Sequence, residues 1–117
     1  MTTESGVLVV QTQWIEGEEH LFDAWYDDTH IPEALGTLEE IGFQSARRFK
    51  RIGSVGVGED WSQCLVLYEI RTSDMEQTCA DFVEIQRQGR LPSGNAAVKP
   101  PVRFAFFTEV TNHSVLP

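Results

Sequence analysis

The densest group of chemically active side chains lies in one run of nine residues, Trp25-Tyr26-Asp27-Asp28-Thr29-His30-Ile31-Pro32-Glu33. An imidazole titrates near neutral pH and moves a proton in either direction, so His30 is the first candidate for a catalytic acid or base. Asp27 and Asp28 lie close enough in sequence to orient the ring or to raise its pKa. The alternative is structural: the histidine caps a broken helix and bonds to the backbone.

Aromatic side chains near this run are candidates for a pocket wall. Trp25 and Tyr26 belong to an apolar stripe at helical spacing, which is more often core than the wall of an aromatic pocket. The hydroxyls of Tyr26 and Tyr68 are candidates for holding a carbonyl or enolate oxygen. Each of these side chains therefore has a structural and a functional interpretation.

A second group of candidates is the basic run at residues 47–51, which holds four of the nine bases of the chain. A strand there places Arg47 on the face opposite Arg48 and Lys50. Arg48 is a candidate for binding a substrate carboxylate through two parallel hydrogen bonds. The alternative is pairing with the protein's own carboxylates.

Composition narrows the classes of function. The 117 residues carry a net charge of −9, which argues against a nucleic-acid partner. No signal peptide and no membrane-spanning run is visible, which predicts a cytoplasmic protein without a membrane partner. The histidines and cysteines lack zinc-type spacing, and the glycines at 53–58 lack the residues of a phosphate-binding loop. The sequence thus predicts neither a metal nor a cofactor.

The elements that must position these residues can be read from periodicity. Strands are predicted at residues 6–14, 43–51, 62–70 and 102–110. A helix at residues 18–29 is expected to break near Pro32 and to resume at residues 32–40. A second helix follows the capping-box pattern at residues 73–76 and stops at Gly89. Residues 1–117 are thus predicted to form a single α+β domain with ferredoxin-like βαββαβ order: a four-stranded antiparallel sheet with two helices on one face.

Several of these strands are apolar on both faces. Two helices cover only one face of the sheet, so the second face is left as a large apolar surface. The sequence therefore predicts a homodimer with the two sheets packed face to face.

The chain also resembles a known family through three motifs. They are Phe22-x-x-Trp25-Tyr26-x-x-x-His30-Ile31-Pro32-Glu33, Gly42-Phe43-x-x-Ala46-Arg47-Arg48-Phe49 and Leu65-Val66-Leu67-Tyr68-Glu69. Together they are similar to the EthD-like branch of the dimeric α+β barrel superfamily. Phe49 stands where that family often has a tyrosine, so a mechanism that needs a phenol there is in doubt.

The resemblance implies a dimeric barrel that acts without a cofactor on a small hydrophobic, aromatic or polyketide-like molecule. The reactions implied are cyclisation, dehydration, isomerisation or oxygenation. We expect His30, Tyr26 and Asp27 in the chemistry, and Trp25, Arg48, Tyr68 and Phe22 in substrate binding. The alternative is a non-catalytic ligand-binding or accessory dimer, such as a component that supports an oxygenase.

Overall fold

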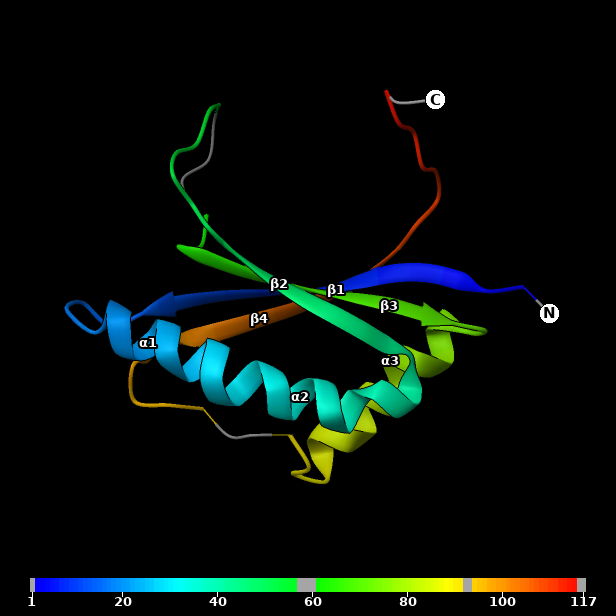
Figure 1. Cartoon of the computed structure of the whole chain (residues 1–117), viewed down its shortest axis with the longest axis horizontal. Helices are drawn as coiled ribbons and strands as arrows, with labels where there is room; N and C mark the ends of the chain where they lie inside the picture. Colours follow the sequence, from blue (N-terminus) through cyan, green and yellow to red (C-terminus); the bar gives the residue numbers. More distant parts are fainter. Residues whose placement is uncertain (1, 57–60, 92–93, 116–117) are drawn as a thin grey trace.

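The computed structural model describes residues 2–56, 61–91 and 94–115, and within them one antiparallel sheet carries the helices on one side (Figure 1). The elements in chain order are β1 (Glu4–Trp14), α1 (Glu19–Trp25), α2 (Ile31–Leu38), β2 (Phe43–Lys50), β3 (Cys64–Thr72), α3 (Met75–Arg87) and β4 (Val98–Thr108). The strand order is β2-β3-β1-β4, and every neighbouring pair is antiparallel. The ferredoxin-like arrangement predicted from the sequence is confirmed.

The first helical segment does not break at Pro32, which corrects the prediction. A π-turn at Tyr26–His30 joins α1 directly to α2, and the Ile31 N–H donates to the Tyr26 carbonyl five residues earlier. Pro32 lies in the first turn of α2, where its missing N–H is tolerated. The helical segment therefore changes its hydrogen-bond pattern before Pro32 and does not break there. A short 3₁₀ turn at Glu39–Ile41 ends the segment.

Helix α3 begins one residue later than the capping-box pattern suggests. Asp74 is the N-cap, and its carboxylate accepts a hydrogen bond from the Gln77 N–H at 3.1 Å. Its buried stripe is formed by Met75, Thr78, Phe82 and Ile85. Val83 lies off this stripe and is exposed.

Strand β4 starts four residues before the predicted position. Trp14 pairs with Val98 and Gln13 pairs with Lys99 after a register irregularity in β1. The two prolines that follow Lys99 lie on an edge strand, where a missing backbone donor is tolerated. Because β4 begins at Val98 and not at residue 102, the loop before it is shorter than predicted.

The sheet has one covered and one uncovered face. The core lies between the helices and the inner face, where Leu8, Val10, Val66 and Tyr68 are buried. The outer face is also rich in apolar side chains, namely Val7, Val9, Phe49, Leu65, Leu67, Ala105 and Phe107. Figure 1 shows residues 51–56 and the chain after β4 rising on this outer side, away from the helices.

A cavity between sheet and helices

A cavity of about 330 Å³ lies between the inner face of the sheet and the helices. Its walls are formed by Leu8, Val10, Trp25, Tyr26, His30, Ala34, Leu38, Tyr68, Phe82, Gln86, Leu91, Gly94, Val98, Val102 and Phe104. Gln86, Gly94 and Phe104 are exposed, so the cavity opens between the end of α3 and β4. Its size and its mostly apolar wall are typical of sites for small ligands.

The π-turn explains why Trp25 and His30 meet. In an α-helix, residues five apart point about 140° away from each other. A π-turn closes after five residues, so Trp25 and His30 lie one above the other. Their rings stack with centroids 4.4 Å apart and an interplanar angle of 20°. Tyr26 packs edge-on against His30 at 5.2 Å, which brings all three rings to the cavity wall.

His30 is a neutral imidazole at neutral pH. Burial lowers its pKa below the ordinary value, and the negative charge of Glu33 opposes this only in part. The expectation that Asp27 or Asp28 would raise this pKa is wrong. The ring nitrogen Nδ1 is buried and has no hydrogen-bond partner among the described residues, so Nε2 is the candidate nitrogen for contact with a ligand.

The two candidate tyrosines have different surroundings. The Tyr26 hydroxyl lies 2.9 Å from the Thr12 Oγ1 and is committed to that hydrogen bond. Burial raises the pKa of both phenols, and of Tyr68 the more strongly, so both stay protonated at neutral pH. The structure gives the Tyr68 hydroxyl no hydrogen bond to any described residue. Tyr68 is therefore the tyrosine whose hydroxyl is free to donate to a ligand.

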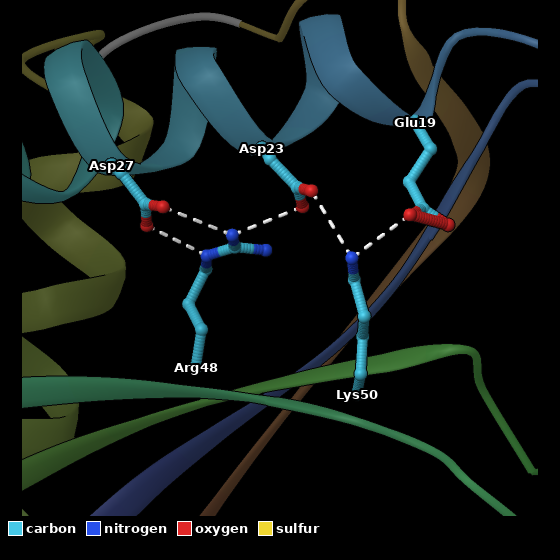
Figure 2. Close-up of polar contacts among 5 residues, drawn as sticks. All are labelled: Glu19, Asp23, Asp27, Arg48 and Lys50. Carbon is cyan, nitrogen blue, oxygen red and sulfur yellow. Dashed lines mark hydrogen bonds and ion pairs between the residues drawn. The ribbon is translucent and has the colours of Figure 1, made fainter.

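Arg48 lies outside the cavity wall, in an ion network between β2 and the first helical segment (Figure 2). Its Nε and Nη2 donate to Asp27 at 2.8 and 3.1 Å, and Nη2 also donates to Asp23 at 3.0 Å. Burial would lower the Arg48 pKa, but these carboxylates raise it above its ordinary value. Lys50 extends the network to Asp23 and Glu19.

The network decides two predicted roles. Asp27 bonds to Arg48 and makes no hydrogen bond to His30, so it does not orient the imidazole. Arg48 takes the alternative role foreseen for it, pairing with the protein's own carboxylates. Burial would raise the Asp23 pKa, but hydrogen bonds from Lys50 and Arg48 hold it below the ordinary value.

Phe22 is placed in the core rather than at the cavity. Its side chain is fully buried, packs against Trp14 and Tyr26, and does not line the cavity. Sequence reasoning missed Gln86 and Leu91, which close the cavity from α3 and the segment after it. No local motif marks these two residues. The hydrogen bond between Thr12 and Tyr26 joins residues 14 apart in the sequence and also has no local signal.

The described residues were also compared with the requirements of a metal site and of a membrane-spanning helix. Among residues 2–56, 61–91 and 94–115, no three metal-ligating side chains come together. No helix in this part of the chain is long and apolar enough to cross a bilayer. No protein family, no curated protein and no solved structure matches the chain.

Proposed function

We propose that this protein is a small enzyme that moves a proton on a hydrophobic, aromatic or polyketide-like molecule, with His30 as the acid or base and without a cofactor. One observation carries the proposal. A ligand-sized cavity with a mostly apolar wall is lined by a neutral imidazole and by a tyrosine hydroxyl that has no hydrogen-bond partner among the described residues. Aromatic walls with few polar groups are typical of sites for such ligands.

The roles follow from the protonation states. A neutral imidazole accepts a proton, so His30 Nε2 takes one from a C–H bond beside a substrate carbonyl. The electron pair of that bond moves to the carbonyl oxygen, where the protonated Tyr68 hydroxyl holds the developing enolate. The enolate then cyclises, loses water, is reprotonated at another carbon or reacts with dioxygen. Trp25 packs against the imidazole and forms part of the wall that receives the ligand.

The placement of His30 on a π-turn also supports a functional site. π-turns inside α-helices are rare and occur frequently at functional sites. Here the turn spans Tyr26–His30 and produces the stacking of Trp25 on His30. A regular helix would place these two rings on different faces.

We further propose that the protein is a homodimer whose outer sheet faces pack together. Phe49 and Phe107 are 43% and 56% exposed on that face, and Val9 and Leu67 lie between them. More exposed apolar side chains lie on the segments that rise beside the face, at Ile52, Val55, Val110 and Val115. Trp61, shortly before β3, is also exposed. An apolar surface of this kind is costly in water, and a second copy offers a matching surface. Membership of the EthD-like branch belongs to the same proposal and rests on the three sequence motifs.

One observation favours the alternative of a non-catalytic ligand-binding or accessory dimer. A histidine that works as a base is commonly oriented by a carboxylate on its second nitrogen. Here Nδ1 has no partner, and Asp27 is committed to Arg48. Binding without turnover would need the same cavity but no proton transfer.

A neutral ketone with acidic methyl protons, 2-acetylnaphthalene, distinguishes the two functions. We expect the wild-type protein to accelerate exchange of its methyl protons in heavy water, followed by proton NMR. His30→Ala should abolish the acceleration, and Tyr68→Phe should reduce it about 100- to 1000-fold. Binding of the ketone without accelerated exchange, or equal exchange by His30→Ala, would contradict catalysis and leave the binding function.

A further inference from the structure

We infer that the cavity selects an uncharged ligand that carries a hydrogen-bond acceptor, and that it excludes carboxylates. The inference rests on the proposed function insofar as the cavity is the ligand site. It reverses the expectation that Arg48 anchors an acidic group.

The first argument is the charge of the wall. None of the 15 described residues that line the cavity is Asp, Glu, Lys or Arg. The two residues between Leu91 and Gly94 in the sequence are Pro92 and Ser93, which are also uncharged. A carboxylate that leaves water for this wall would lose its hydration without gaining a counter-charge.

The second argument is that the two cations of β2 on the cavity side are already paired. Arg48 and Lys50 are on the helix-facing side of β2, the side on which the cavity lies. Three hydrogen bonds hold the Arg48 guanidinium to Asp23 and Asp27, and two hold the Lys50 ammonium to Glu19 and Asp23. A ligand carboxylate would have to displace two fixed carboxylates of the protein to reach Arg48.

The third argument is the kind of hydrogen bond that the wall offers. The protonated Tyr68 hydroxyl is a donor, and the Gln86 side chain at the mouth offers a second donor. Neutral His30 adds one nitrogen that either donates or accepts, according to its tautomer. A ketone, quinone or ester oxygen matches these groups without bringing a charge into the cavity.

A pair of probes of nearly equal shape tests the inference. In 2-acetylnaphthalene a methyl group stands where 2-naphthoate has a charged oxygen. The affinity of each is measured by NMR titration on the full chain, with the Trp25 indole and His30 imidazole signals as reporters. Naphthalene, which has no acceptor, is the third probe.

We expect the ketone to shift both signals and to bind at least about tenfold more tightly than the carboxylate. Tyr68→Phe should weaken the binding of the ketone and leave the affinity for naphthalene unchanged, because only the ketone accepts a hydrogen bond from the hydroxyl. Arg48→Met releases the π-turn and should therefore change the affinities for the ketone and the carboxylate by the same factor. The matched control Arg47→Met, on the opposite face of the strand, should change neither affinity.

The contrary results are distinct. Binding of 2-naphthoate as tight as that of the ketone overturns the charge selection and leaves the ligand site standing. So does an Arg48→Met variant that loses affinity for 2-naphthoate but keeps its affinity for the ketone. Equal affinities for naphthalene and the ketone overturn the acceptor requirement. Failure of all three probes to shift Trp25 and His30 overturns the cavity as a ligand site, and with it the proposed function.

Discussion

Arg48 holds Asp27 through two parallel hydrogen bonds, from Nε to Oδ1 at 2.8 Å and from Nη2 to Oδ2 at 3.1 Å. Asp27 is the second residue of the π-turn, so this pair ties the turn to strand β2. The guanidinium also lies 5.8 Å from the centre of the Tyr26 ring. The pair is therefore placed to fix the turn that presents Trp25, Tyr26 and His30 to the cavity.

We predict that Arg48→Met lowers the free energy of unfolding by about 1 to 3 kcal/mol, because two carboxylates lose charged hydrogen bonds. Urea denaturation measures the loss. The same variant should shift the NMR signals of the Trp25 indole and the His30 imidazole, because the π-turn is released. Lys50→Met is the matched control, since Lys50 shares Asp23 but makes no hydrogen bond to the π-turn. If both variants leave the two ring signals in place, the pair does not position the turn.

Features of the fold that depend on residues close together in the sequence could be predicted, and features that depend on distant residues could not. The strand at residues 6–14 could be predicted, and its burial alternates residue by residue, because the period of a strand is local. The break at Pro32 was wrong because a π-turn has no sequence signature distinct from a helix end. A proline indicates that the helical hydrogen-bond pattern must change near it, but it does not indicate whether the change is a break or a π-turn.

The site was harder to predict than the fold, since its chemistry depends on competition between neighbours. Proximity in sequence suggested Asp27 as the partner of His30. Arg48, 21 residues further along the chain, takes that carboxylate instead, and nothing local to residues 25–33 reveals it. Gln86 reaches the cavity wall only because α3 packs on the same face of the sheet as the π-turn segment.

The lowered pKa of His30 predicts a pH dependence of stability. Burial disfavours the charged ring, so the unfolded chain binds a proton at a higher pH than the folded chain does. Between the unfolded value near 6.5 and the lower folded value, acidification therefore favours unfolding. Above about pH 7 both states are neutral, and this contribution is constant.

We expect the wild-type protein to lose stability from pH 7 to pH 5 more steeply than His30→Gln, as measured by urea denaturation at each pH. His20→Gln is the control, because the same change is made at an exposed histidine in α1. Parallel curves for the wild-type protein and His30→Gln would show that the ring is not held neutral by burial.

The proposed dimer predicts a mass of twice the 13.2 kDa of the chain in sedimentation equilibrium. Leu67→Lys on the outer face should convert the dimer to monomer, because a two-fold interface brings buried ammonium groups close together. Val83→Lys places the same charge on α3, on the side of the helices, where Val83 is 59% exposed. That variant should stay dimeric. A monomeric wild-type protein would contradict the proposed packing of the outer faces.

Two glycines of the α2–β2 region predict opposite effects of the same substitution. Gly42 has φ of +109°, and a Cβ there would lie 2.5 Å from the Arg71 carbonyl oxygen, which is backbone of β3. Gly42→Ala should therefore lower the free energy of unfolding by at least about 2 kcal/mol.

Gly36 lies inside α2, and a Cβ there meets nothing within 4 Å. Gly36→Ala should raise stability by about 0.5 to 1 kcal/mol, because alanine loses less backbone entropy in a helix. Urea denaturation compares both variants with the wild-type protein, and a neutral Gly42→Ala would mean that the turn into β2 relaxes away from Arg71.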